Sequence, residues 1–480
     1  MADPRVAVAG GGMHPQADSP LAIIPLELLV RMTYFITTKD LGELRLSCKV
    51  IERALWNFFS HEFFSKKQFM ASPLSLQALV DISNHASLAP CLKHVIICTD
   101  RYPDSVFAQP DRQQVLNRTR DEYESLLSTG LLMSSLAKAF ANLPNLETVD
   151  MRDFNSPTRS RDQAWWTSYG VSNLTRQIGS PPAVDGGADS ESYRFRSMLF
   201  QAIVAALGVA NARPSSLEVN MRSHALHDKA YLVPSIPSGL ETPISQMLAG
   251  LKRLHVFLLP PHHLTWDLTN IKKFLLLAPN LTWLRINLSS RYTSPGQYAD
   301  AVEMLCWVAG LKSDGKTPLS PTTEVPTFQL DMLELGSFQL RPAALQGIAR
   351  SYSKTLQSLS FRRVTLISLP QEDEDKINLW AGLIGSFQKL GNLRRLSLAQ
   401  LKQGNNRISL PHPDDAQAGK RCNERTFKET SGLKIAEIAA GMVTPDWPAP
   451  PAEMDVDDDE EDYDEDDDDE DDDDEDDDDA

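Results

Sequence analysis

Apolar residues at every second position recur along the chain and predict short, half-buried β-strands. In three places Pro or Gly, then Asn and Leu, lead into the alternation: residues 141–151 (ANLPNLETVDM), 277–288 (LAPNLTWLRINL) and 389–398 (KLGNLRRLSL). A weaker form of the same pattern predicts further strands over 216–221, 251–259, 330–338 and 356–364. The chain is therefore expected to contain at least seven similar strands.

A helical stretch precedes most of these strands. The stretches are residues 120–143, 194–212, 270–278, 342–353 and 375–390. Helix followed by strand, repeated, implies a parallel sheet that helices cover. The recurring Leu-x-x-Leu-x-Leu type of strand resembles the leucine-rich repeat, which implies an irregular α/β solenoid. The alternative is an ordinary α/β domain, whose buried parallel strands resemble one another because all of them are apolar.

A short apolar unit opens the patterned part of the chain. Pro25 suits the first turn of a helix because it has no N–H to leave unpaired. Asp40 with Glu43 three residues later predicts a capped second helix. The first helix should carry one apolar face made of Leu28, Leu29, Met32 and Ile36, and the second should carry Leu41, Leu44, Cys48, Ile51 and Leu55. Helices this short bury little surface, so the unit is expected to pack against something else.

Residues 21–60 resemble an F-box. The positions in register are Ile24, Pro25, Glu27, Leu28, Leu29, Met32, Ile36, Asp40, Leu41, Leu44, Cys48 and Lys49. Two positions depart from the usual pattern, since Ile24 replaces Leu and Ser47 replaces Val. Residues 63–98 are similar, more loosely, to the segment that follows the F-box in filamentous-fungal F-box proteins.

The F-box resemblance implies a role in the ubiquitin conjugation pathway rather than a reaction. F-box proteins are substrate receptors of SCF ubiquitin ligases: the F-box binds a Skp-family adaptor, the adaptor binds a cullin, and the C-terminal domain binds the protein client. Carried over, the adaptor-binding residues are Ile24, Pro25, Leu28, Leu41, Leu44 and Cys48. The alternative is an F-box-containing scaffold, or a nuclear chaperone that binds basic proteins through an acidic tail without ubiquitination.

The strand alternation also predicts a client-binding face. If Leu146, Val149 and Met151 point inward, the intervening side chains point outward, and the same holds on the later strands. The client-binding candidates are Asp150, Trp283, Arg285, Asn287, Arg362 and Arg395. Trp283 is the best single anchor because Trp and Arg dominate interface energetics, although it could equally be a core residue.

Charge is concentrated at one end of the chain. The net charge is −18, but 23 of the last 26 residues are acidic, and removing them leaves residues 1–454 at +5. Such a run cannot collapse, so residues 444–480 are expected to be a disordered, Pro-rich and acidic tail. The tail could solubilise the chain, fold back on the mildly basic body, or capture basic clients.

Breaks in the pattern give the expected domain boundaries. Residues 1–18 should be disordered, 19–68 should form an all-α F-box of the helical-hairpin type, and 69–443 should form the leucine-rich-repeat-like domain. Segments rich in Pro, Gly, Ser and Asp predict insertions near 155–192 and 312–327 and a linker over 402–420. The aromatic pair Trp165-Trp166 lies in the first insertion and either anchors a partner or pins the insertion to the body.

Other sequence features argue against catalysis, cofactors and membranes. The five cysteines are scattered and never spaced as Cys-x-x-Cys, so neither a disulfide framework nor a zinc site is expected. His224, His227, His262 and His263 have no carboxylate or cysteine at ligand spacing, so a metal is not expected. No nucleotide-binding or hydrolase motif occurs, and no run reaches the ~18 apolar residues of a membrane helix. The chain is expected in the cytoplasm or nucleus. Nucleic acid is not an expected partner.

Overall fold

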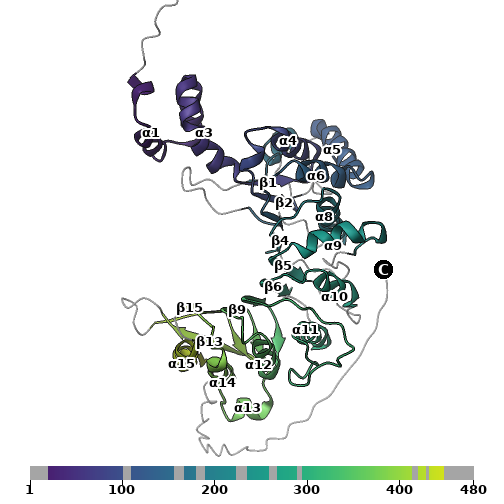
Figure 1. Ribbon diagram of the computed structural model, residues 1–480, viewed down its shortest axis with the longest axis vertical. Coiled ribbons are helices and arrows are strands. Elements are labelled where there is room, and N and C mark those ends of the chain that lie inside the picture. The colour runs from purple at the N-terminus through teal and green to yellow at the C-terminus, as the bar shows by residue number, and fades with distance from the viewer. Residues whose placement is uncertain are drawn as a thin grey trace, which may run out of the picture. The chain divides into compact units, whose positions relative to one another are not determined.

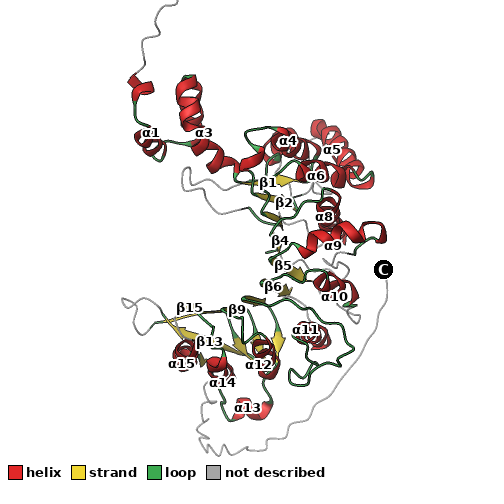
Figure 2. Ribbon diagram, viewed as in Figure 1, coloured by secondary structure: helices red, strands yellow, loops and turns green. Residues whose placement is uncertain are grey.

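Ten strands of the chain form one mixed sheet, as the computed structural model shows (Figures 1 and 2). The structure describes residues 20–100, 110–155, 167–179, 190–222, 235–258, 267–288, 295–412, 420–428 and 432–447. The strand order is β1-β2-β3-β4-β5-β6-β7-β9-β11-β15, and every pair is parallel except the last, in which β15 runs antiparallel to β11. The chain as far as Asp446 forms one compact unit.

Seven of the ten strands of the large sheet lie at the predicted positions. The ten are β1 (Lys66–Met70), β2 (His94–Cys98), β3 (Thr148–Arg152), β4 (Ser216–Asn220), β5 (Arg253–Leu258), β6 (Trp283–Leu288), β7 (Met332–Gly336), β9 (Ser358–Arg362), β11 (Arg395–Ala399) and β15 (Glu424–Lys428). The seven strands expected from the alternation are β3 to β7, β9 and β11. Position was therefore predictable from the pattern of apolar residues.

Fifteen α-helices occur in the described part of the chain. They are α1 (Leu26–Thr33), α2 (Thr38–Ser47), α3 (Lys49–Phe64), α4 (Pro73–Asn84), α5 (Pro110–Ser128), α6 (Leu131–Ala141), α7 (Val171–Ile178), α8 (Ser190–Val209), α9 (Glu241–Ala249), α10 (Thr269–Leu276), α11 (Pro295–Val308), α12 (Pro342–Ser351), α13 (Pro370–Glu374), α14 (Leu379–Ser386) and α15 (Gly432–Met442). Short 3₁₀ helices span Pro20–Ile23, Ala89–Cys91, Ser238–Leu240 and Phe387–Lys389. Proline opens α4 and α12, where its missing N–H needs no partner.

A second, smaller sheet lies at the C-terminal end of the described chain. Its strands are β8 (Gln339–Leu340), β10 (Thr365–Leu366), β12 (Lys402–Gln403), β13 (Asn406–Pro411), β14 (Arg421–Cys422) and β16 (Thr444–Pro445). Strands β12 and β13 fall in the segment 402–420, so the linker predicted there is wrong. Strand β16 pairs with β13 and lies inside the segment 444–480, which we expected to be disordered. The acidic run 455–480 lies outside the described residues.

The main core lies between one face of the large sheet and the helices. Leu254, Leu284, Leu333 and Leu359 occupy one register row across β5, β6, β7 and β9, and each is at most 2% exposed. Figure 1 shows α8 to α11 on the same side of β4 to β6. Alternation then sends the remaining side chains of these strands to the opposite face, which is polar.

The predicted leucine-rich-repeat-like solenoid is wrong. The strands belong to one mixed α/β sheet that ends in an antiparallel strand, and the strands of a second sheet alternate along the chain with the last strands of the first. The helices between strands range from five residues in α13 to twenty in α8, so the units are not equal repeats. The shared strand motif has a simpler cause, because any buried parallel strand needs apolar residues of this kind.

Two local expectations also need correction. Thr37, rather than Asp40, is the N-cap of α2: its side chain accepts from Asp40 N at 3.1 Å, and Asp40 lies at the third helical position of the capping box. The segment 312–327 is not a free insertion. Leu319 and Val325 pack against the main core, and Trp307 Nε1 donates to Glu324 O at 2.9 Å.

Candidate functional site

The polar face of the large sheet brings together the predicted client-binding residues. In the described register, Asp150, Glu218, His255 and Arg285 form one continuous row across β3 to β6, and Glu334 continues it on β7. Trp283 belongs to the neighbouring row on the same face. This arrangement follows from the period of two in each strand and the unbroken parallel register between strands.

Trp283 is held within a cluster of charged side chains. Its Nε1 donates to Glu334 Oε1 at 2.9 Å, and the guanidinium carbon of Arg253 lies 3.9 Å from the centre of its ring. Arg285 Nε lies 3.8 Å from Glu334 Oε2, so Trp283 and Arg285 share one partner. Trp283 is partly buried on the polar face and does not belong to the apolar core. A partly buried Trp beside Arg is the composition typical of an interface anchor.

Asp150 lies on the polar face but has no exposed surface. Its Oδ2 accepts from Arg152 Nε at 2.9 Å, its Oδ1 accepts from Asn220 Nδ2 at 3.1 Å, and His94 Nε2 lies 3.5 Å from Oδ2. Burial alone would raise the pKa of Asp150, but His94 and Arg152 favour the charged form and leave that pKa below its usual value. Asp150 therefore organises this end of the face, and the expectation that it is exposed to a client is wrong.

His255 lies next to Trp283, in the adjacent row of the same face. Its ring centre is 5.1 Å from that of Trp283, and its Nδ1 lies 3.6 Å from Glu218 Oε2. Burial lowers the pKa of His255 to about 4, an effect that the charges of Arg285 and Arg253 reinforce and that of Glu218 opposes. At neutral pH the imidazole is uncharged and fills the face beside the Trp.

The remaining client-binding candidates surround a polar hollow of about 210 Å³ at the far end of this face. Arg285, Asn287, Arg362 and Arg395 line it, together with the carboxylates of Glu334 and Glu424. Arg362 Nη1 lies 3.7 Å from Glu424 Oε2 in a solvent-exposed pair. A side chain at Gly336 would collide with that of Asn287, so the glycine leaves room for Asn287. A hollow of this volume, lined by both cations and carboxylates, suits a polar segment of a partner protein.

Sequence reasoning missed several residues of this surface. Arg253, His255 and Glu334 contact Trp283 directly, and Glu218 lies close to Arg253 and His255. They lie on β4, β5 and β7, whose strand patterns were weaker in the sequence. Applying the same alternation to those strands would have found all four.

The N-terminal helices form a second surface, which is apolar. Leu29, Leu41, Ile51, Leu55 and Phe63 make a small core of their own. Outside it, eight of the sixteen exposed large apolar side chains in the described chain occur between residues 23 and 50. This apolar surface consists of Ile23, Leu26, Leu28, Met32, Tyr34, Phe35, Leu46 and Val50.

The six predicted adaptor-binding residues divide between these two groups. Pro25 and Leu28 are exposed, whereas Leu41 is fully buried in the small core. Ile24, Leu44 and Cys48 are partly buried and pack against that core. The expected apolar face of the first helix divides in the same way: Leu29 points inward, and Leu28 and Met32 point outward.

Several sequence expectations fall outside the described residues. They are the histidines His224, His227, His262 and His263, and the aromatic pair Trp165-Trp166. Within the described ranges, no group of three or more His, Cys, Asp or Glu side chains could hold a metal ion. A search of the same ranges finds no helix long and apolar enough to cross a membrane.

Comparison with protein-family models and with curated proteins finds no match for this chain. The F-box resemblance therefore depends on the residues quoted for it.

Proposed function

We propose that this chain is a non-catalytic substrate receptor of an SCF-type ubiquitin ligase. The N-terminal helices would bind a Skp-family adaptor through the apolar surface, and the adaptor would join the chain to a cullin. The polar face of the large sheet would bind a protein client, with Trp283 as its central anchor. Both roles are binding roles, and they use different surfaces.

The observation that carries this proposal is the apolar surface. Leu28 is 53% exposed, Phe35 83% and Leu46 87%, and each apolar side chain in water costs free energy in proportion to its area. Soluble proteins rarely expose contiguous apolar surface unless a partner covers it. The surface lies within the segment that resembles an F-box, so the two observations support the same partner.

The client surface has independent support from its composition. Trp283, Arg253 and Arg285 are of the residue types that dominate measured interface energies. Their partners Glu334 and Glu218 hold them in fixed orientations before any client arrives. Such preorganisation lowers the entropy lost on binding.

The adaptor role is tested by reversing the character of the apolar surface. The double variant Leu28→Glu/Phe35→Glu places two charges where the adaptor would exclude water. Loss of one such anchor typically costs about 2 kcal/mol, or about 30-fold in affinity, so the double variant should bind the purified adaptor at least about 30-fold more weakly. Titration calorimetry with the full chain measures this directly.

A matched control distinguishes lost docking from a general effect of charge. Leu131 is 52% exposed and Val209 is 50% exposed, and both lie outside the N-terminal helices. Leu131→Glu/Val209→Glu should bind the adaptor with the affinity of the unmodified chain. Equal adaptor binding by the two double variants, or no binding of a Skp-family adaptor by the unmodified chain, would contradict the proposal.

A further inference from the structure

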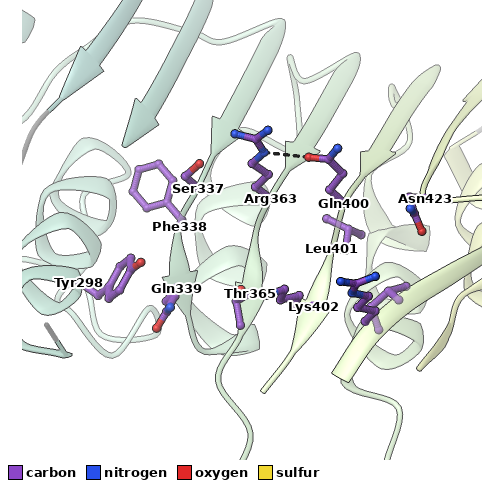
Figure 3. A pocket seen from close by; sticks show the side chains of 12 residues that line it. Tyr298, Ser337, Phe338, Gln339, Arg363, Thr365, Gln400, Leu401, Lys402 and Asn423 are labelled. Atoms are coloured by element: carbon purple, nitrogen blue, oxygen red, sulfur yellow. Dashed lines mark hydrogen bonds between the residues drawn. The ribbon is translucent and has the colours of Figure 1, made fainter. Parts of the chain in front are cut away.

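A polar hollow of about 470 Å³ lies where the large sheet meets the second sheet (Figure 3). Its lining includes the cations Arg363, Lys402 and Arg407 and the amides Gln339, Gln400 and Asn423. No carboxylate occurs among the lining residues that the structure describes. Small-molecule pockets are mostly apolar. A polar lining with three cations instead suits a hydrated, negatively charged ligand.

The backbone builds the rim of this hollow from three equivalent turns. Ser337, Arg363 and Gln400 each follow a strand of the large sheet, and their φ angles are +61°, +55° and +52°. Backbone bonds connect the turns laterally: Ser337 N donates to Arg362 O at 2.9 Å, and Arg363 N donates to Ala399 O at 2.8 Å. Residues other than glycine rarely adopt positive φ, and sites that keep them are often functional.

Two of the cations face each other across neighbouring strands. Lys402 on β12 pairs in register with Arg407 on β13, and both side chains are exposed. Like charges directly opposite each other on antiparallel strands are destabilising. Neither cation forms an ion pair with a described residue. An anion between them would remove this repulsion.

The third cation is oriented toward the same hollow. Arg363 Nε donates to Gln400 Oε1 at 2.8 Å, and Figure 3 shows this bond along the upper rim. Lys402 and Thr365 lie below it in the same view. A guanidinium has the planar geometry that matches the oxygens of a tetrahedral anion.

We propose that this hollow binds a phosphate ester. Three cations around one open space match a group that carries close to two negative charges, and the amides and hydroxyls of the lining supply further donors. The phosphate could belong to a phosphorylated side chain or to a small phosphorylated metabolite, and the hollow is large enough for either. The site is separate from the apolar surface of the N-terminal helices and from adaptor binding.

Titration calorimetry of the full chain tests the site with three probes at low ionic strength: inorganic phosphate, a short phosphoserine peptide and glucose 6-phosphate. We expect the unmodified chain to bind inorganic phosphate, and at least one of the esters more tightly than phosphate alone. The ester whose affinity exceeds that of inorganic phosphate by the larger factor shows whether the ligand is a phosphorylated peptide or a metabolite. Binding of that ester should weaken as salt rises, because exposed charges are screened over about 8 Å at physiological ionic strength.

The double variant Lys402→Gln/Arg407→Gln should bind the preferred ester about tenfold more weakly or worse. Lys389→Gln/Lys428→Gln removes the same charge from two exposed lysines outside the hollow and should bind normally. When both double variants are made in chains that end at residue 454, the ratio of their affinities for the ester should be the same. Equal affinities of the two double variants, or no binding of any probe by either form of the unmodified sequence, would overturn the proposal.

Discussion

The strongest stability prediction concerns the buried carboxylate of Asp150. Asp150→Asn keeps the shape of the side chain but removes the charge that Arg152 faces. The Arg152 side chain is only 8% exposed, so its guanidinium would remain buried without the charge of Asp150 beside it. Breaking a buried ion pair by removing one partner costs about 3–5 kcal/mol, and the remaining amide oxygen should keep the loss near the lower limit, at about 3 kcal/mol.

The size of this effect is measurable because whole proteins are stable by only about 5–15 kcal/mol. Urea denaturation at pH 7, followed by tryptophan fluorescence and by circular dichroism, gives the change in the free energy of unfolding. The double variant Asp150→Asn/Arg152→Gln removes both charges and should recover a large part of the loss, since neither is then left uncompensated. Glu424→Gln breaks the exposed pair with Arg362 and should cost less than about 1 kcal/mol.

Acidification provides a second check on the same carboxylate. The folded-state pKa of Asp150 is lowered, so its stabilising contribution is fully present above about pH 4, the pKa expected in the unfolded chain, and is lost as the pH falls through the folded value. The stability difference between the unmodified chain and Asp150→Asn should therefore shrink in strong acid. A loss at pH 7 no larger than that of Glu424→Gln would refute the argument from burial.

Two further predictions concern charge elsewhere in the chain. The pKa of His255 is lowered to about 4, so the unfolded chain takes up a proton below about pH 6.5 before the folded chain does. Relative to His255→Phe, the unmodified chain should therefore lose about 2–3 kcal/mol of stability between pH 6.5 and 4, which urea denaturation across that range measures. Deleting residues 455–480 should leave the melting temperature nearly unchanged but increase retention on heparin resin at low salt, since the remaining chain carries +5; equal retention, or a large fall in melting temperature, would contradict this.

Strand positions were predictable because they depend on local alternation. Leu254 and Val256 on β5 point to the core while His255 and Phe257 occupy the alternate positions, as a period of two requires. The polar face followed from the same rule once the strands were assumed to be parallel. Burial on that face was not predictable, because Asp150 is enclosed by Arg152, His94 and Asn220 from three different places in the chain.

The larger architecture was harder to predict because it depends on pairing at long range. Residues 402–420 contain two Gly, two Asn and two Pro, which locally favour turns. Lys402 and Gln403 nevertheless form β12, because β10 on one side and β13 on the other supply hydrogen-bonding partners. The hollow between the two sheets also depends on pairing at long range, because its lining residues come from segments that no local pattern connects.

The two edges of the large sheet have a consequence for self-association. At one edge, the chain around Tyr169 covers β1, with Tyr169 N donating to Gln68 O at 2.8 Å. At the other edge, β15 reverses direction and carries Glu424, Arg425 and Lys428. Charged edge strands disfavour the docking of further strands, and a covered edge has fewer free backbone groups to offer. A sheet bounded in this way resists growing into fibrils by adding copies end to end, even though its interior is a long, apolar, parallel array.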